Sequence, residues 1–527
     1  MSDNLLLSSL TLHLHPDDPL VIARQAIPAG TQLIVDEAAA QRASLPFKSI
    51  LARQAIPAGH KLALRPLAAG EEVLRYGCRI GVATQTIAPG DWIHSHNLSV
   101  GEMGREFSLQ VVESAAPGAE SGETFAGYPR PNGQAGVRNL IAVVATVSCA
   151  AQTARAIAHA FPPEALAAYP NVDGVIAITH TLGCCDPLNS LAHHYLQRAL
   201  LNLAYHPNIG ALIYIGLGCE GNQMGDLVAA LHNTAEGQEA HAPVGPYLVI
   251  QEQGGIAKTA AAGVEALKAL LPQVNAVARQ PVPVSRLMVA LQCGGSDSWS
   301  GVTANPLVGK AADRLVLAGG TAVLAETPEI YGAEQLLTCR VASEAVGQKL
   351  IERLRWWQEH SRAAGFSLDN NPSPGNKAGG LTTIFEKSLG AVAKGGSTPL
   401  MHVAEYAERI TARGLVFMDT PGYDPASVTG QTAGGCNLTI FTTGRGTVYG
   451  GSLAPCIKVV SNSAVYRRME ADMDFNAGAI LEGVPIEQAA QELWAQVIRV
   501  ASGERSKSEL SGFREIEFLP WHLGGML

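Results

Sequence analysis

Residues 125–150 hold the pattern that most restricts how this 527-residue chain can fold. A polar, glycine-containing loop leads into a run of small and β-branched apolar residues at 140–147, which is too short for a helix and typical of a buried strand. The strand ends at Ser148-Cys149, and AQTARAIAHAF follows with helical spacing. A strand, a reactive residue and a helix form the unit of an open α/β sheet, whose ligands lie beyond the carboxyl ends of its strands.

The same order recurs further along the chain. Apolar strands are predicted at 174–179, 211–217 and 287–292, and the residues that follow them include His180 with Cys184, Cys219, and Cys293. Four predicted strands therefore each bring a cysteine to their last residue or to the next loop. If these strands are parallel neighbours, we expect the thiols to converge on one edge of a sheet. Cys149, Cys184, Cys219 and His180 are candidate metal ligands.

Composition limits the class of protein. The chain is longer than one hydrophobic core usually supports, so roughly 100–200 residues per domain predict two to four domains. A net charge of −9 without a basic run argues against a nucleic-acid partner. The sequence shows no basic leader and no apolar run of the ~18 residues that a membrane span needs, which predicts a cytoplasmic protein.

Two further counts concern assembly and redox state. Charged residues make up 16% of the chain, below the usual ~25%, so we expect other subunits to cover part of the surface, as in a homodimer. Nine cysteines are an odd number, which favours thiols, metal ligands or small buried residues over disulfides.

Residues 1–98 are predicted to form a separate β-clip domain. The octapeptide ARQAIPAG occurs at 23–30 and again at 52–59, and looser copies follow at 65–70 and 85–90. Each copy combines short β segments with a Pro/Gly turn. His60, His94 and His96 lie at such turns, where they could face a ligand or simply lie at the surface. Residues 99–124 have the composition of a linker.

The rest of the chain is divided into an α/β domain at 125–370 and a C-terminal α/β domain at 371–527, in which we expect anion-binding loops. The segment 371–400 sets Asn376, Lys377, Lys387 and Lys394 among glycines, which favours anion binding over a plain surface loop. Further strands are predicted at 321–326, 414–418, 437–442 and 456–460, and the region 486–503 is predicted to be helical.

Two of these strand ends carry candidate ligand-binding residues. Glu326 lies at the end of the strand at 321–326, where it is either a turn acid or a ligand contact. Gly444-Arg445 follows the strand at 437–442, where a guanidinium could hold a carboxylate in a bidentate fork.

Long ordered motifs across almost the whole chain resemble the altronate dehydratase and galactarate dehydratase family of sugar-acid hydro-lyases. They are GHKLAL, RYG, HSHN, GYPRPNGQAGVRN, TVSC, GLGCE, QCGGSD, SGVTANP, PSPGNKAGGLTTIFEKSLG, MDTPG, SVTGQ and FTTGRG. Asn132, Gln134 and Cys185 stand where the family commonly has Asp, Arg and Gly, which bears on fine specificity. The resemblance implies an α/β fold: a small N-terminal β-clip (SAF-like) domain, then a larger α/β body of mostly parallel sheets in two subdomains.

The resemblance also implies a reaction, the metal-dependent dehydration of a sugar acid to a 2-keto-3-deoxy acid. HSHN and MDTPG resemble the altronate enzymes, so the first expectation is D-altronate to 2-dehydro-3-deoxy-D-gluconate, and galactarate is the second. A lyase that expels another β-substituent, such as sulfite, and a non-enzymatic sugar-acid-binding protein remain alternatives. The product that the protein releases distinguishes these alternatives from one another.

Two metal arrangements remain open. Fe²⁺, with Mn²⁺ as an alternative, could be held by His60, His94 and His96 lying over the cysteine edge, or three thiols could hold an iron–sulfur cluster. Removing a proton next to a carboxylate needs a positioned base and a cation for the developing charge. The expected catalytic residues are Lys377, His60 and Arg445, and the expected substrate-binding residues are Arg138, Asn376, Lys387, Gly444 and Glu326.

Overall fold

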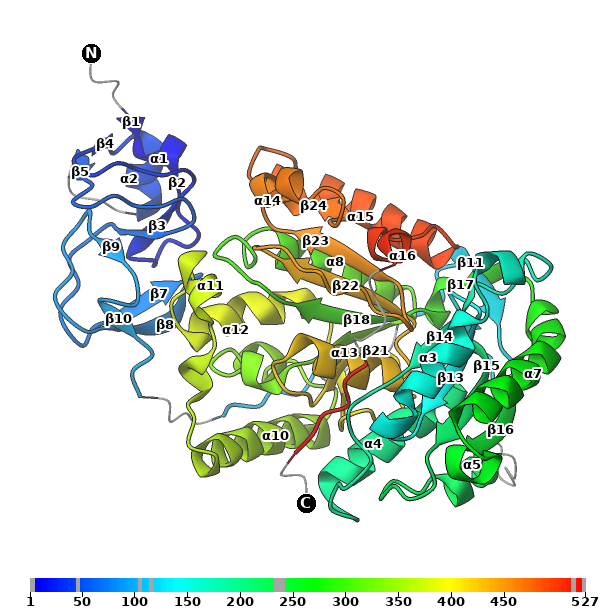
Figure 1. Ribbon diagram of the computed structural model, residues 1–527. Helices are drawn as coiled ribbons and strands as arrows, with labels where there is room; N and C mark the ends of the chain where they lie inside the picture. Colours follow the sequence, from blue (N-terminus) through cyan, green and yellow to red (C-terminus); the bar gives the residue numbers. More distant parts are fainter. Residues whose placement is uncertain are drawn as a thin grey trace.

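A computed structural model describes residues 5–43, 48–102, 107–112, 118–231, 242–512 and 518–523. Figure 1 shows a small β domain at the left, a large α/β unit in the centre and a second α/β unit at the right. The predicted fold class, a small β domain followed by an α/β body with mostly parallel sheets, is confirmed. Within the described residues, no helix combines the length and the apolar character needed to cross a lipid bilayer.

The N-terminal domain is built from the internal repeat. Ile27 and Ile56, which occupy equivalent places in the two octapeptides, form a bridge and are both buried, and Leu67 and Ile87 of the looser copies form another. Its sheets are β2-β3-β6-β9, β10-β8-β7 and β1-β4-β5. Its elements are β1 (Leu5–Leu6), α1 (Leu7–Leu10), β2 (Thr11–Leu12), β3 (Leu20–Ala23), β4 (Gln32–Ile34), α2 (Glu37–Ala43), β5 (Ser49–Leu51), β6 (Lys61–Ala63), β7 (Glu72–Arg75), β8 (Cys78–Ala83), β9 (Trp92–Ile93) and β10 (Leu98–Ser99).

The unit at the right of Figure 1, here called the middle unit, contains a four-stranded parallel sheet of order β14-β13-β15-β16. Alternate residues of β13 face opposite sides, so α3 and α7 pack on one face and α4 packs on the other. Because helices cover both faces of the sheet, all eight residues of β15 are buried. The elements are β13 (Leu140–Ala145), α3 (Ala151–His159), β14 (Gly174–Ile178), α4 (Leu191–Leu201), β15 (Ile209–Gly216), α5 (Gly225–Leu231), β16 (Val244–Val249), α6 (Ile250–Gln253) and α7 (Ile256–Asn275).

The central unit is organised on a seven-stranded sheet, with the order β20-β21-β19-β18-β22-β23-β24. Every pairing in it is parallel. Its strands are β18 (Met288–Cys293), β19 (Thr321–Leu324), β20 (Leu400–Ala404), β21 (Gly414–Met418), β22 (Leu438–Thr443), β23 (Cys456–Val460) and β24 (Phe475–Asn476). Its helices are α8 (Ala304–Leu317), α9 (Gln335–Thr338), α10 (Glu344–Ala363), α11 (Pro374–Ala378), α12 (Ile384–Val392), α13 (Asp424–Ala433), α14 (Ser463–Arg468), α15 (Ile486–Ala501) and α16 (Lys507–Ser511).

This sheet crosses the expected boundary at residue 370. Strands β18 and β19 precede that residue and pair directly with β22 and β21, which follow it. The chain instead enters and leaves the middle unit through the antiparallel sheet of β11 (Thr124–Pro129), β12 (Ala135–Gly136) and β17 (Gln280–Pro283). The apolar run of a strand does not record which sheet the strand joins, because the pairing partner lies far away in sequence.

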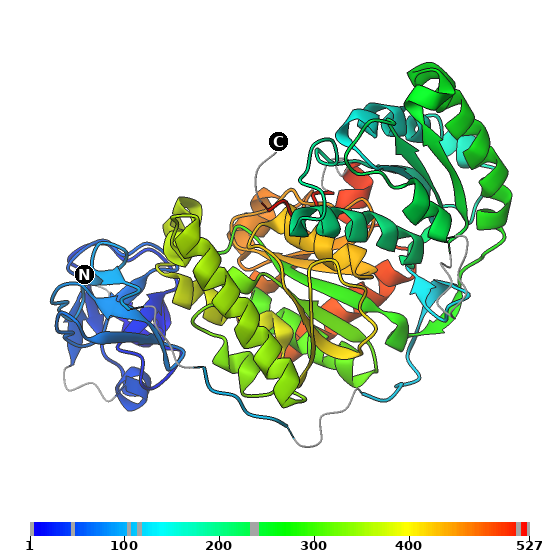
Figure 2. The same cartoon turned by 90° about the horizontal axis from the view of Figure 1, so that it is seen from below.

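Residues 107–112 of the segment expected to be a linker run along the central unit in Figure 2. The Val112 N–H donates to the Val341 carbonyl at 2.9 Å, so part of this segment is docked rather than free.

Candidate active site and metal centre

A cavity of about 440 Å³ opens at the carboxyl edge of the seven-stranded sheet. Cys293 ends β18, Glu329 follows β19 and Asp424 follows β21, and all three line the cavity. Lys387 of α12 and Asn371 complete its polar wall. Ligands of parallel α/β sheets bind at this edge, and a concave site with a few convergent polar groups is the usual form of a binding pocket.

One group at this edge has the geometry of a metal site. Cys293, Glu326 and Glu329 are buried and offer ligand atoms within 4.8 Å of one another, which no other group of three such residues does in the described ranges. Glu326 has a φ of 71°, a left-handed conformation that is unusual for a residue with a side chain. Both of its carboxylate oxygens are buried without a hydrogen-bond partner. A buried carboxylate is costly unless a cation or a proton compensates it, so the donor set fits a metal ion.

Two buried lysines surround this group. Lys387 Nζ donates to Glu329 Oε1 at 2.6 Å and to Asn371 Oδ1 at 2.8 Å. Lys394 Nζ donates to Cys293 Sγ at 2.6 Å. The site therefore combines two ammonium groups with a thiol and several carboxyls, and it can both bind an anion and exchange protons.

Burial controls the electrostatics of the site. It raises the pKa of Glu326 well above its usual range, and the charge of Glu329 raises that pKa further. Burial would also raise the pKa of Glu329, but the Lys387 ammonium outweighs it and lowers that pKa. Burial raises the pKa of Cys293 to about 12 despite Lys394, and burial with Glu329 raises the pKa of Asp424 to about 6. A metal ion would have to displace the protons of Cys293 and Glu326.

Two glycines allow carboxylates to approach the backbone. A Cβ on Gly294 would lie 2.2 Å from Asp424 Oδ2, and one on Gly444 would lie 2.1 Å from Asp297 Cγ. Asp297 is buried and accepts hydrogen bonds from Ser300 and, at 2.8 Å, from Ser461 Oγ. Gly444, expected to bind substrate, thus makes room for the carboxylate that ties these loops together.

The N-terminal domain docks on the helices beside the cavity, as Figure 1 shows for β7 and β8 next to α11 and α12. Lys61 and Arg75, both fully buried, reach Glu386 of α12, and the Lys61 Nζ to Glu386 Oε1 distance is 2.7 Å. His60 Nε2 lies 3.3 Å from the Ala378 carbonyl, and His94 Nε2 lies 2.9 Å from the Lys377 carbonyl. The domain therefore holds the backbone of α11, which borders the cavity.

The histidines lie away from the expected cysteine edge. In His60, Nδ1 accepts from Trp92 Nε1 at 3.2 Å and Nε2 contacts the Ala378 carbonyl, while burial lowers the His60 pKa to about 4. His94 contacts α11, and His96 is exposed beside Trp92. They lie elsewhere because the N-terminal domain docks on the central unit and not on the middle unit.

His180 supports its own loop. Its Nε2 lies 3.0 Å from the Ala145 carbonyl, and its Nδ1 accepts from the Leu182 N–H. Burial lowers its pKa to about 4. Because both ring nitrogens contact the backbone, His180 offers no free nitrogen to a metal in this arrangement.

Of the residues expected to bind substrate or act in catalysis, Glu326, Lys387 and Asn376 lie at the cavity or at the metal group beside it. Asn376 chiefly fixes α11, because it forms a capping box with Ser373 and its Nδ2 donates to the Ser296 carbonyl at 2.9 Å. Lys377, on the same short helix, does not line the cavity.

The two expected arginines also lie outside the cavity. Arg445 is exposed, and its backbone N–H donates to the Gly295 carbonyl at 2.8 Å. Arg138 makes a bidentate contact with Glu509 at 2.7 and 2.8 Å and donates to the Val500 carbonyl at 2.9 Å. Arg138 therefore ties the middle unit to the C-terminal helices.

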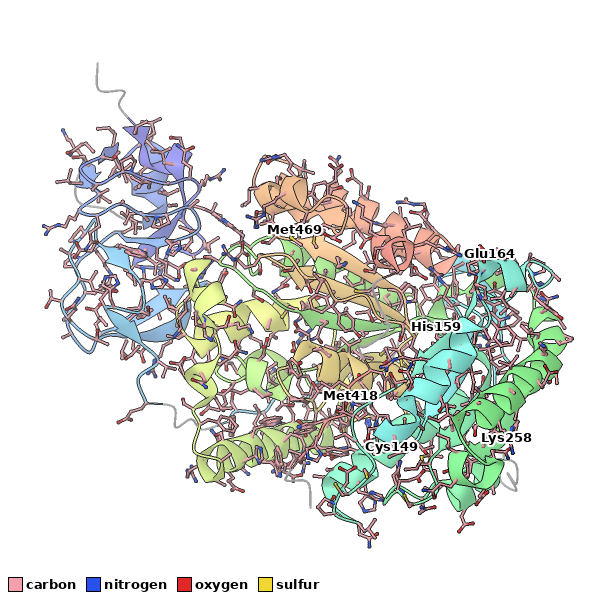
Figure 3. All side chains as sticks on the ribbon, viewed as in Figure 1. Cys149, His159, Glu164, Lys258, Met418 and Met469 are labelled. Atoms are coloured by element: carbon pink, nitrogen blue, oxygen red, sulfur yellow. The ribbon has the colours of Figure 1, made fainter. Side chains whose placement is uncertain are left out.

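Sequence reasoning assigned no site role to Glu329 or Asp424, whereas it placed Cys293 among the converging thiols and Lys394 in the predicted anion-binding segment. Asp424 was detectable as a carboxylate in the turn that follows β21. The cysteines Cys149, Cys184 and Cys219 follow β13, β14 and β15 as expected, on the middle unit where Figure 3 labels Cys149. None of these thiols lines the cavity, because β18 and its Cys293 belong to the other sheet.

A parallel α/β body with a buried thiol, carboxyls and lysines around a cavity defines an enzyme of acid–base chemistry with a candidate metal centre. Comparison with known families is more specific. The family model described as Altronate/galactarate dehydratase SAF domain matches residues 9–101, D-galactarate dehydratase/Altronate hydrolase, second domain, matches 127–275, and D-galactarate/Altronate dehydratase, C-terminal, matches 284–525. The chain belongs to the altronate/galactarate dehydratase family, which confirms the predicted family.

Three relatives show the range of this family. Altronate dehydratase of Escherichia coli (strain K12) is 34% identical over 509 residues, which cover 96% of this chain and 98% of that protein. Galactarate dehydratase (L-threo-forming) of the same organism is 36% identical, and the match covers 84% of this chain and 85% of that protein. (2R)-sulfolactate sulfo-lyase subunit beta of Chromohalobacter salexigens is 32% identical, and the match covers 75% of this chain and 96% of that protein. The family matches at 127–275 and 284–525 divide the chain between the two parallel sheets, as the fold does.

Proposed function

We propose that this protein is a metal-dependent hydro-lyase that converts D-altronate to 2-dehydro-3-deoxy-D-gluconate. The buried group of Cys293, Glu326 and Glu329, next to a cavity of about 440 Å³ with a lysine in its wall, carries this proposal. The relative named altronate dehydratase, which matches more of the chain than the galactarate enzyme does, supports the choice of substrate. The cavity has room for a six-carbon acid, since ligand pockets start at about 300 Å³.

The metal is assigned to the thiolate of Cys293 and the carboxylates of Glu326 and Glu329. The unpartnered oxygens of Glu326 support this assignment. A divalent ion held there would act as a Lewis acid on the oxygens of the substrate. Fe²⁺ suits a mixed thiolate and carboxylate set better than Mn²⁺, which prefers oxygen ligands alone.

Substrate binding is assigned to the wall formed by Lys387 and Asn371. The Lys387 ammonium is held by Glu329 and by Asn371, so its position is fixed before a substrate enters. A fixed cation can bind the carboxylate of the sugar acid and stabilise the enediolate that develops from it. This assignment moves the cationic role from Lys377 and Arg445, which lie off the cavity, to Lys387.

Proton removal is assigned to Asp424. Its carboxylate lies beside Gly294 on the cavity wall, where Gln292 Nε2 donates to Oδ1 at 3.4 Å. A pKa of about 6 leaves this group mostly ionised at neutral pH and able to accept a proton. Asp424 takes the proton from C2, hydroxide leaves from C3, and the two depart as water. The remaining enol ketonises to the 2-keto acid.

Expulsion of sulfite is the second candidate function. The relative named (2R)-sulfolactate sulfo-lyase subunit beta matches 75% of this chain. Proton removal would be the same in both reactions, and only the group that leaves from C3 would differ.

The test is to supply the Fe²⁺-loaded, full-length protein with D-altronate, galactarate or (2R)-sulfolactate under anaerobic conditions, and to measure keto acid and sulfite. Keto acid from D-altronate, without sulfite from sulfolactate, is expected. Lys387→Met should lower kcat by about 100-fold or more, whereas Lys268→Met, at an exposed lysine of the middle unit, should retain turnover. Binding of sugar acids without any keto acid would overturn catalysis in favour of a sugar-acid-binding protein.

A further inference from the structure

Three thiols of the middle unit meet at one edge, apart from the cavity. Cys149, Cys184 and Cys219 follow β13, β14 and β15, which are adjacent parallel strands in the order β14-β13-β15. All three are free and exposed. Backbone hydrogen bonds join their loops: the Ser148 N–H donates to the Leu182 carbonyl at 2.9 Å, and the Gly221 N–H donates to the Cys184 carbonyl at 2.8 Å.

Buried polar side chains fix these three loops. Asp186 accepts from the Gly183 N–H at 2.6 Å, and Glu220 accepts from the Leu217 N–H at 3.0 Å. Asn222 Nδ2 donates to the Thr146 carbonyl at 2.8 Å, next to the loop of Cys149. The three side chains are at most 7% exposed. Hydrogen bonds from buried side chains therefore fix the loops that carry the thiols, as is typical of a pre-organised site.

The cysteines of these loops, Cys149, Cys184, Cys185 and Cys219, are all exposed. Soft thiolate ligands favour soft metals and iron–sulfur clusters. Four exposed cysteines in three touching loops are unusual, because cysteine is among the most buried residue types.

The spacing of the thiols argues against a single ion. In a tetrahedral site with metal–sulfur bonds of ~2.3 Å, the thiolates lie roughly 3.8 Å apart. The sulfur atoms of Cys149, Cys184 and Cys219 do not form a group within 4.8 Å, a limit that Cys293, Glu326 and Glu329 satisfy. In an iron–sulfur cluster each cysteine binds a different iron, so the cysteine sulfur atoms lie further apart than they do around a single ion. Gln251 Nε2 donates to Cys219 Sγ at 3.3 Å, and hydrogen bonds to sulfur are one of the features that tune iron–sulfur clusters.

We propose that Cys149, Cys184 and Cys219 bind an iron–sulfur cluster at the carboxyl edge of the four-stranded sheet, separate from the metal centre at Cys293. The three thiols lose their protons and each binds one iron of a [4Fe–4S] unit. The fourth iron has no ligand from this set and faces the open edge. The proposal goes beyond the dehydration reaction, because no residue of this edge lines the cavity.

The test uses the full-length protein, incubated anaerobically with equal amounts of Fe²⁺ and Fe³⁺ and with sulfide, and then desalted. Iron, acid-labile sulfide and visible absorption are measured on the wild type and on the triple variant Cys149→Ser/Cys184→Ser/Cys219→Ser. Wild-type protein should retain about four sulfides per chain and the triple variant fewer than about one. Cys339→Ser, at an exposed thiol of the central unit, is the matched control and should retain the wild-type sulfide.

The outcomes are distinct. Equal sulfide in the wild type and the triple variant would overturn the proposal, as would a metal ion lost from the triple variant without any sulfide, which would indicate a single-ion site. Cys293→Ser should lower iron without lowering sulfide, so that the two centres are measured separately. Far-ultraviolet circular dichroism of the triple variant should match the wild type, because exposed positions tolerate substitution within about 0.5 kcal/mol.

Discussion

Replacing Glu386 with Gln tests how the N-terminal domain is held. Glu386 is fully buried in α12 and contacts Lys61 at 2.7 Å and Arg75, both from that domain. Thr382 also donates to it at 2.5 Å through Oγ1. Glu386→Gln keeps the shape of the side chain but removes the charge that balances two buried cations.

The magnitude follows from the pKa of Glu386. Burial would raise this pKa, but Lys61 and Arg75 outweigh it and lower the pKa from its usual 4.5 to about 2. That difference corresponds to roughly 3 kcal/mol of interaction with the ionised form. It agrees with the ~3–5 kcal/mol cost of removing one partner from a buried ion pair. The loss is limited because burial already lowers the Lys61 pKa to about 8, so Lys61 can release its proton when Glu386 is replaced.

The assay is urea unfolding at pH 7, where Glu386→Gln should lower the free energy of unfolding of the docked N-terminal domain by about 3 kcal/mol. Glu265→Gln removes an exposed ion pair and should cost at most ~1 kcal/mol. A loss for Glu386→Gln no larger than that of Glu265→Gln would refute the reasoning. Because the folded pKa of Glu386 is depressed, its stabilisation is complete above pH 4.5 and is lost as the pH falls towards 2, so the difference from the wild type should narrow over that range.

Three further predictions concern the cavity. Glu326→Gln should lower bound Fe²⁺ at least ~10-fold by elemental analysis, while Glu344→Gln, at an exposed glutamate that begins α10, should bind as the wild type does. Asp424→Asn should stop exchange of the C2 proton with deuterated solvent while the sugar acid still binds; wild-type exchange would place the base elsewhere. Arg445→Lys should keep kcat/KM within about 2-fold of the wild-type value, because Arg445 is exposed and lies off the cavity. A loss of about 100-fold would instead show that Arg445 positions the substrate.

The sequence determined the local elements of the fold. The predicted strands at 414–418 and 456–460 coincide with β21 and β23, and the predicted helix at 486–503 contains α15. The repeated octapeptide pairs with itself through Ile27 and Ile56. These features are encoded within short windows, because apolar periodicity and turn residues act over a few neighbours. The placement of three thiols at one edge was also predictable, since each strand is followed directly by its cysteine. The homodimer and the cytoplasmic location stay predictions.

Only the tertiary structure decided which residues form the candidate site. Lys387 reaches the buried carboxyl of Glu329 and Lys394 reaches the Cys293 thiol. Lys377 of the same glycine-rich segment lies off the cavity. Cys293 has the same sequence context as Cys149 but joins a different sheet, where it meets Glu326 and Glu329. Strand order, and therefore the partners at a sheet edge, depends on pairing between segments more than a hundred residues apart, such as β18 with β22. No local pattern records that pairing, because a strand presents the same backbone donors and acceptors to any neighbour.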